Sequence, residues 1–261
     1  MTIAPEHERP QARGSEESDS VAVAFGDREA RTYGLARVAL GGGESSGMGL
    51  LFAGDEPVAV RTEGVSVEVV EPLRRWKASC DGLFDLDVEA LSAPAEVAVG
   101  ATTGYEQLCR VRGVAGGRRL DCLGQRGHSW GRTDWSKLEL ARTLSAWLDD
   151  ATAATVSAVR EQSAKHHADE EIAAHVVLGG TPIPVADPRV STRYDAEGRQ
   201  VHAGLELWVS DGGGELPHRA AGEVVCGTTL DLGSLRLDCA FFEWHMEGRT
   251  GVGRYDVVRR A

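Results

Sequence analysis

The sequence predicts an all-β protein, and three observations support this prediction. Short apolar or alternating segments recur at regular intervals, with turn residues between them. Residues 84–91 (FDLDVEAL) alternate between apolar and acidic side chains, which is typical of a strand with one buried face. Asp81-Gly82, just before this segment, is a strong hairpin dipeptide. Eight or more such segments indicate a β-sandwich or β-barrel.

Apolar or alternating runs that end at turn residues predict the strands of the first half. In order, these strands are residues 21–25, 35–40, 48–52, 58–61, 65–70, 76–80, 84–91, 107–114 and 119–123. The run 35–40 stops at Gly41-Gly42-Gly43, and the run 65–70 ends before Pro72. Gly116-Gly117 separates the last two runs, which predicts a hairpin.

The second half repeats this pattern, with one ambiguous region. The strands expected here are residues 201–210, 223–230, 235–246 and 251–258, with a turn at Gly212-Gly213-Gly214. Residues 137–162 are rich in Leu, Ala, Glu and Arg, which favours a helix by propensity. Asp149-Asp150 can equally turn a hairpin between two strands. Local pattern leaves both possibilities open.

Charge and hydropathy exclude several classes of partner. The 28 Lys and Arg residues against 40 Asp and Glu residues give a formal net charge of −12 over 261 residues. Such a surface repels phosphate backbones and anionic lipids, so nucleic acid is not an expected partner. No apolar run reaches the roughly 18–20 residues that a membrane span needs.

The N-terminus and the cysteines indicate a cytoplasmic protein. Residues 1–19 lack the apolar core of a secretory signal, and their polar, proline-bearing composition predicts a disordered tail. None of the five cysteines forms a CxxC pair. We therefore expect reduced and mostly buried thiols in a reducing compartment.

The segment 124–135 (GQRGHSWGRTDW) carries most of the residues suited to chemistry. It places a histidine, two arginines, an aspartate and two tryptophans between turn-forming glycines, near the middle of the chain. Aromatic side chains beside an imidazole and a carboxylate are typical of a ligand pocket that is mostly apolar and has a few polar groups.

This segment resembles the G-x-R-x-H-S-W-G-x-R-D-W signature of the hydroxyneurosporene synthase (carotenoid hydratase)/AttH-like family of double lipocalin-like, calycin-type proteins. Residues 67–76 are similar to the family's "evveP-rr" strand, residues 105–107 to its "hyEq" segment, and residues 243–253 to its closing "dGR-G-G" hairpin. The chain departs from the signature at Thr133, where many relatives carry an arginine, and Arg132 can substitute.

The resemblance implies two lipocalin-like β-barrel or half-barrel lobes, at residues 20–135 and 136–261, after the tail at 1–19. It also favours strands in the ambiguous region. The family includes carotenoid and isoflavonoid hydratases and cyclases that act on polyketide or terpenoid chains, alongside many members without an assigned activity. Because one fold hosts many functions, the activity has to be inferred from the residues of the site and not from the fold.

His128 and Asp134 are the first candidates for chemistry, and each has a structural alternative. His128 can act as a general acid or base, or as a structural imidazole between lobes. Asp134 can protonate an alkene if burial raises its pKa. Alternatively it forms a buried ion pair with Arg126 or Arg132, which would lower its pKa and make it a poor acid. That pair, in a dry core without an adjoining cavity, would favour a binding or structural role over catalysis.

The aromatic residues and a nearby carboxylate complete the predicted pocket. Trp130 and Trp135 either line it, stabilising a cation over their ring faces, or pack in a core. Tyr105 is a hydrogen-bond donor to ligand or a half-buried aromatic. Glu106 either orients His128 or the neighbouring arginine, or is an ordinary strand carboxylate.

Two further groups of residues are weaker candidates. Glu243 and His245 share one face of a strand, so they form an acid/base pair if that face points inward and a solvated pair if it points outward, which we favour. His166, His167 and His175 have no further ligand at a suitable spacing, so no metal is expected.

The leading hypothesis is a cytoplasmic lipocalin-like protein that binds a small lipophilic, isoprenoid- or polyketide-like molecule. It would carry out cofactor-free hydration (as a lyase) or cyclisation (as an isomerase). Its predicted catalytic residues are His128, Asp134 and Glu106. Its predicted ligand-binding residues are Tyr105, Arg126, Trp130, Arg132, Trp135, Glu243 and His245. The alternatives are a non-catalytic carrier with the same fold, or a structural protein of a larger complex. Sequence pattern specifies neither the ligand nor the oligomeric state.

Overall fold

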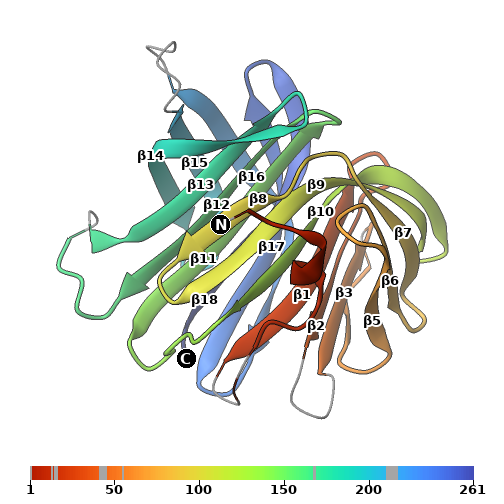
Figure 1. Cartoon of the computed structure of the whole chain (residues 1–261), viewed down its shortest axis with the longest axis horizontal. Coiled ribbons are helices and arrows are strands. Elements are labelled where there is room, and N and C mark those ends of the chain that lie inside the picture. Colours follow the sequence, from red (N-terminus) through yellow and green to blue (C-terminus); the bar gives the residue numbers. More distant parts are fainter. Residues whose placement is uncertain are drawn as a thin grey trace. The chain divides into compact units, whose positions relative to one another are not determined.

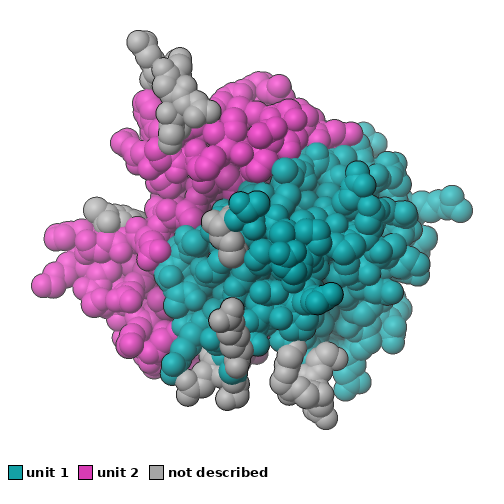
Figure 2. Space-filling view, in the orientation of Figure 1, with its two compact units in different colours: residues 1–133 teal, residues 134–261 magenta. Residues whose placement is uncertain are grey.

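The computed structural model describes residues 2–12, 14, 17–40, 46–54, 56–166, 169–209 and 217–261. The chain divides into two compact units, Met1–Thr133 and Asp134–Ala261, which Figure 2 colours teal and magenta. Apart from one short 3-10 helix, the elements in the described ranges are β-strands (Figure 1). The predicted all-β class is confirmed.

Unit 1 is a single curled sheet preceded by the 3-10 helix. Its elements are η1 (Pro5–Glu8), β1 (Ser18–Asp27), β2 (Thr32–Ala39), β3 (Gly47–Ala53), β4 (Ala59–Arg61), β5 (Val65–Glu71), β6 (Arg75–Cys80), β7 (Phe84–Ala90), β8 (Ala95–Val99), β9 (Thr102–Ala115) and β10 (Arg118–Gly131). Among the described residues the strands follow the order β4-β3-β2-β1-β10-β9-β7-β6-β5, and β8 adds to β9.

The hairpin of β9 and β10 is the centre of this sheet. Gly116 and Gly117 connect the two strands with φ angles of 57° and 74°, the left-handed conformation that a tight two-residue turn requires. The predicted hairpin is therefore present, with strands longer than the apolar runs suggested. On its far side β10 pairs with β1, which places Val23 opposite Arg126.

Unit 1 has its own hydrophobic core. Phe25 of β1 meets Phe84 edge-on, with ring centroids 5.5 Å apart. Trp76 of β6 and Val111 of β9 are buried in the same cluster. Apolar residues at alternate positions of β7 supply Leu86 and further side chains, as the alternating pattern predicted.

Unit 2 is a closed barrel. Its strands are β11 (Leu138–Asp149), β12 (Thr152–Glu161), β13 (Glu171–Leu178), β14 (Thr181–Tyr194), β15 (Gln200–Val209), β16 (His218–Asp231), β17 (Leu235–Met246) and β18 (Arg249–Arg260). Each strand pairs with the next, and β18 pairs back with β11 to close the ring. With the curled sheet of unit 1, this is the expected pair of barrel and half-barrel.

The ambiguous region 137–162 forms the strands β11 and β12, joined by a turn at Asp149. Alternate positions in β11, such as Leu140, Leu144 and Leu148, point into the barrel core. The pairing of β11 with both β12 and β18 satisfies its backbone groups, which outweighs the local helix propensity.

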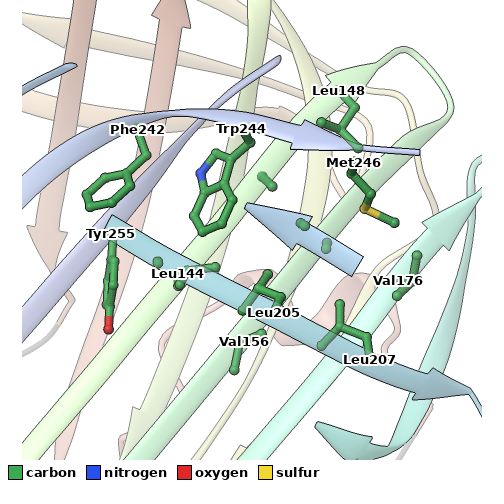
Figure 3. Close-up of a cluster of buried hydrophobic side chains, with 14 of the residues drawn as sticks. Leu144, Leu148, Val156, Val176, Leu205, Leu207, Phe242, Trp244, Met246 and Tyr255 are labelled. Carbon is green, nitrogen blue, oxygen red and sulfur yellow. The ribbon is translucent and has the colours of Figure 1, made fainter. Parts of the chain in front are cut away.

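Aromatic and aliphatic side chains occupy the interior of the barrel (Figure 3). Phe242, Trp244 and Met246 alternate along β17 and all project inward. They meet Leu205 of β15 and Tyr255 of β18. The rings of Phe242 and Tyr255 lie 5.4 Å apart.

Three expectations concern other parts of the chain. The segment before residue 20 differs from the predicted disordered tail where it is described, since Pro5–Glu8 form the 3-10 helix and Glu8 is buried. The five cysteines are free thiols, and all except the half-buried Cys226 are buried.

The turns at 41–43 and 212–214, and His167, lie outside the described residues. No helix in the described ranges is both long and apolar enough to cross a membrane.

Candidate functional site

The chemistry-bearing residues of unit 1 gather on one face of β10. Arg126, His128 and Trp130 occupy alternate positions of this strand, so their side chains project to the same side. Register places Tyr105 of β9 opposite His128 and Asp19 of β1 opposite Trp130. Three neighbouring strands therefore bring together two basic side chains, Arg126 and His128, one acidic side chain, Asp19, and the aromatic rings of Trp130 and Tyr105.

His128 is paired with Asp19. Its Nε2 lies 2.7 Å from Oδ1 of Asp19, and both side chains are inaccessible to solvent. The other carboxylate oxygen of Asp19 accepts hydrogen bonds from the backbone N–H groups of Gln11 and Ala12, the latter at 2.9 Å. Asp19 therefore uses one oxygen for His128 and the other for residues 11–12, which fixes the orientation of its carboxyl.

This pairing fixes the state of the imidazole. Burial lowers the pKa of His128 below its ordinary value of 6.5, while the hydrogen bond to Asp19 partly opposes the shift. The ring is therefore neutral at pH 7, with its proton on Nε2 facing Asp19. Nδ1 is then the basic nitrogen, and it has no hydrogen-bond partner within the described ranges.

Arg126 is fully buried and lies between two aromatic rings. The centre of its guanidinium is 4.9 Å from the ring centroid of Trp76 and 4.9 Å from that of Tyr105. Its Nη1 donates to the Tyr105 hydroxyl, and its Nη2 donates to Oε2 of Glu8. Its Nε–H finds no acceptor among the residues that the structure describes.

Glu8 supplies the counter-charge from the 3-10 helix. Its second oxygen, Oε1, accepts from the backbone N–H of Leu73 at 2.9 Å and from Nε1 of Trp76 at 3.1 Å. Its side chain is 4% exposed and that of Arg126 is 0% exposed, so this is a buried ion pair. An Arg–carboxylate pair without water depends on such additional donors.

Aromatic rings border the two polar groups. The rings of His128 and Trp130 have centroids 5.0 Å apart at 65°, and Tyr105 meets His128 edge-on at 5.8 Å. Trp130 is half-buried and stacks on His7 at 6.0 Å. Burial raises the pKa of Tyr105, so its hydroxyl stays protonated.

Asp134, which was predicted to belong to the site, does not lie beside Arg126 and His128. Asp134 is exposed and hydrogen-bonds to Ser136 and Lys137, so it forms no buried ion pair with Arg126. The Ser136 hydroxyl, followed by Lys137, lowers the pKa of Asp134, which makes it a poor acid. The predicted buried ion pair of Asp134 with Arg126 or Arg132 is wrong, because Glu8 pairs with Arg126 and both Asp134 and Arg132 are exposed.

Three other predicted residues also stand apart from His128. Glu106 lies opposite Gly127, the residue just before His128 in β10. The side chain of Glu106 and those of His128 and Arg126 therefore lie on opposite faces of the sheet. Arg132 follows β10 and is exposed, and Trp135 belongs to unit 2 and is 37% exposed.

Glu243 and His245 lie on the outer face of the unit 2 barrel. Their side chains are 36% and 61% exposed and approach to 3.4 Å, and His245 also hydrogen-bonds to Thr250 at 3.0 Å. This is the outward, solvated alternative. Within the described ranges, no three His, Cys, Asp or Glu side chains are grouped as metal ligands.

Unit 2 holds a second cluster with the same three residue types as the Arg126 cluster. Arg142 of β11 donates through Nε and Nη2 to both oxygens of Glu170. Its Nη1 donates to Thr192 at 3.3 Å and to Tyr255 at 3.5 Å. Because Glu170 binds with both oxygens, this guanidinium is better satisfied than that of Arg126.

Sequence reasoning missed Glu8 and Asp19, which are the acidic partners of the site. Asp19 carried a weak signal, because it precedes the apolar run 21–25 at an even spacing and so shares a face with Val21 and Val23. Glu8 carried none, since a polar segment before the first strand offers no periodicity.

Comparison with known families identifies this chain. The model of a family described as a domain of unknown function, DUF7064, matches residues 46–260. The chain belongs to the DUF7064 family. This match begins at residue 46, so Glu8 and Asp19 lie outside it, whereas Arg126 and His128 lie within it. No curated protein matches the sequence.

Several solved structures share the fold of this DUF7064 protein. Kievitone hydratase from Nectria haematococca aligns with a TM-score of 0.63 at 13% identity, over 99% of this chain and 93% of that chain. CghA aligns with a TM-score of 0.66 at 10% identity, over 94% and 88%. A Nitrosomonas europaea protein given the name AttH aligns with a TM-score of 0.61 at 10% identity, over 98% and 96%. The predicted resemblance to double lipocalin-like proteins is thus confirmed for the fold.

Proposed function

We propose that this DUF7064 protein binds a small lipophilic molecule at the His128 face of unit 1. We further propose that His128 transfers a proton in a cofactor-free hydration or cyclisation. The observation that carries the proposal is a pair of buried nitrogens without partners in the described chain. Nδ1 of His128 is an acceptor and Nε–H of Arg126 is a donor, and the two side chains share one strand face. Buried polar atoms are rarely left unpaired unless they serve a ligand or an ordered water.

The surroundings of these two nitrogens suit a molecule that is mostly apolar. Tyr105 and Trp130 border His128, and Trp76 borders Arg126. Binding sites for lipophilic molecules combine such aromatic walls with a few placed polar groups. Relatives in fold add support, since one is named a hydratase of kievitone and another, CghA, has a structure with Sch210972.

The chemistry follows from the state of His128. In a hydration, Nδ1 accepts a proton from water as the water oxygen bonds to one carbon of a double bond conjugated to a carbonyl. The carbonyl oxygen takes up the π electron pair as an enolate, and the imidazolium then returns the proton to the other carbon. In a cyclisation, a hydroxyl of the substrate replaces the water. Asp19 stabilises the imidazolium that forms between the two steps, as a carboxylate does for a catalytic histidine. A neutral imidazole in a dry site is suited to this role.

The experiment combines binding and turnover in the full chain. Farnesal and retinal, which carry a carbonyl conjugated to a double bond, serve as isoprenoid probes. Binding is followed by native mass spectrometry, and turnover is followed by the gain of one water mass or by a new chromatographic isomer. We expect His128→Gln and Asp19→Asn to lower any turnover by about 10²- to 10⁴-fold while binding persists. Glu243→Gln, on the outer face of unit 2, is the matched control. Turnover that is the same in all three variants would remove the role of His128.

A non-catalytic role is the second candidate, and a specific observation favours it. The pairs Glu8–Arg126 and Asp19–His128 both tie the N-terminal segment to the sheet of unit 1. Unit 2 contains a comparable buried ion pair, Arg142–Glu170, which is not next to His128. A buried Arg–Glu pair in this fold can therefore serve the structure alone. Under this alternative the probes bind without any change of mass, and His128→Gln alters stability alone.

A further inference from the structure

Glu8 occupies a pocket that is built to receive a carboxylate. Its two oxygens accept three hydrogen bonds from groups outside its helix: Nη2 of Arg126, the backbone N–H of Leu73 and Nε1 of Trp76. We propose that this pocket is a binding site for the carboxylate of a lipophilic organic acid, with Glu8 as its internal occupant. The inference deepens the proposed function and rests on it, because the pocket lies beside His128.

Two of the three donors, those of Arg126 and Trp76, belong to strands of the sheet, and the third is the backbone N–H of Leu73 in the turn between β5 and β6. Arg126 lies in β10 between β1 and β9, and Trp76 lies in β6 between β5 and β7. Glu8 arrives from outside the sheet, on a 3-10 helix of four residues. Removing this helix from the face would leave the ring of donors intact and open to another carboxylate.

Glu8 leaves part of the guanidinium unused. Only Oε2 of Glu8 contacts Arg126, through Nη2, and the buried Nε–H next to it finds no acceptor among the described residues. A carboxylate that approaches along the Nε–Nη2 edge accepts two parallel hydrogen bonds, which is the stronger geometry. Glu170 makes this bidentate contact with Arg142 in unit 2. A free acid can therefore make a contact with Arg126 that Glu8 does not make.

The rest of the acid is expected to be apolar. Tyr105 and Trp130 lie on the same side of the sheet as the pocket. An acyl or isoprenoid chain attached to the carboxylate would replace the contacts of the 3-10 helix with these rings. Nδ1 of His128 would then face the chain of the acid near its carboxylate.

The first test uses the unaltered full chain and hydrogen–deuterium exchange. The probes are sodium octanoate and octanamide, an uncharged amide with the same chain, which serves as the control. We expect octanoate to displace Glu8 and so to increase exchange in residues 2–12, where the N–H groups of Gln11 and Ala12 donate to Asp19, while the amides of β9 and β10 stay protected. Octanamide should leave exchange unchanged. Equal exchange with octanoate, octanamide and buffer would overturn the proposal.

The second test vacates the pocket by substitution. In Glu8→Ala, we expect sodium acetate to raise the Tm by roughly 3–6 °C at ten times its dissociation constant, and acetamide to leave it unchanged. Glu6→Ala, on the exposed side of the same helix, is the matched control and should not respond to acetate. Glu8→Gln fills the pocket without charge and should respond weakly. An acetate response equal in Glu8→Ala and Glu6→Ala would contradict the site. If Glu8→Ala does not fold, the exchange experiment decides alone.

The two proposals fail separately. Loss of the octanoate effect together with intact binding of farnesal would remove the carboxylate site and leave the proposed function standing. Displacement of Glu8 by octanoate together with unaltered turnover in His128→Gln would keep the carboxylate site and remove the catalytic role.

Discussion

The Asp19 carboxylate lies 2.7 Å from Nε2 of His128, although 109 positions separate the two residues in the sequence. The pairing of β1 with β10 brings them together, because it sets Ser20 opposite Ser129 and places Asp19 and His128 on either side of that pair. The geometry decides which nitrogen of the imidazole is basic, and it also anchors residues 11–12 through the second oxygen of Asp19.

Asp19→Asn should therefore change both stability and titration. The amide removes the charge that stabilises the protonated ring, so the pKa of His128 should fall further below 6.5. It also presents an N–H₂ group to the N–H donors of Gln11 and Ala12, and we expect unfolding to become easier by about 2–3 kcal/mol. NMR titration of the imidazole and urea unfolding measure the two effects. Asp134→Asn, at an exposed carboxylate, should change neither the titration nor the unfolding midpoint appreciably.

The Glu8–Arg126 pair predicts a strong asymmetry between single and double substitutions. Glu8→Gln leaves a buried guanidinium without its counter-charge, so we expect a loss of about 3–5 kcal/mol in the free energy of unfolding. Arg126→Met, which leaves Glu8 buried, should cost a similar amount. The double variant Glu8→Leu with Arg126→Met should recover most of the loss, because well-packed apolar groups replace buried ion pairs at little cost. A double-mutant cycle by urea unfolding measures this coupling, and strictly additive losses would contradict it.

The central motif shows how far the sequence alone can predict the site. Arg126, His128 and Trp130 alternate along β10 and so share one face, but the strand expected from the apolar run ended at residue 123 and did not reach them. The motif continues to Asp134 and Trp135, yet β10 ends at Gly131 and these two residues turn out to be exposed. Residues after the end of β10 therefore do not join the face that carries His128, although they are close to it in the sequence.

The acidic half of the site depends on contacts that periodicity does not encode. Asp19 reaches His128 only through the register of two strands that are distant in the sequence. Glu8 reaches Arg126 through a four-residue 3-10 helix, which is too short to leave a repeating pattern. The strands β13 and β14 were also missed, because β14 contains three prolines that a strand pattern excludes. The alternating and glycine-bounded strands, in contrast, followed directly from local pattern.

Acidification should weaken unit 2 through His175. Burial lowers the pKa of His175 to about 4, whereas an unfolded histidine titrates near 6.5. The unfolded state thus binds more protons between these values, so stability falls as the pH drops from 6.5 towards 4. We expect a loss of roughly 2 kcal/mol at pH 5 relative to pH 7. Amide exchange in β12 and β13 at the two pH values measures it. His175→Asn should flatten this dependence, and His245→Asn, at an exposed position, should preserve it.

The seam that closes the barrel depends on two glycines of β18. A Cβ atom at Gly253 would lie 1.8 Å from the backbone oxygen of Ser145, and one at Gly251 would lie 1.9 Å from that of Trp147. Such contacts are far inside van der Waals distance, so β18 can approach β11 this closely only without a side chain at these positions. These are the glycines of the closing hairpin that resembles the AttH-like pattern, which gives that part of the pattern an architectural reason.

Gly253→Ala should accordingly open the β11–β18 seam. The backbone must shift to accommodate the methyl group, and we expect unfolding of unit 2 to become easier by at least about 2 kcal/mol. Amide exchange in β11 and β18 should rise first, because these strands lose their mutual hydrogen bonds, while β9 and β10 of unit 1 keep their protection. Thr250→Ala changes an exposed side chain of the same strand and serves as the control. Exchange that rises equally in β14 and β15 would indicate general destabilisation and would contradict a role specific to closure.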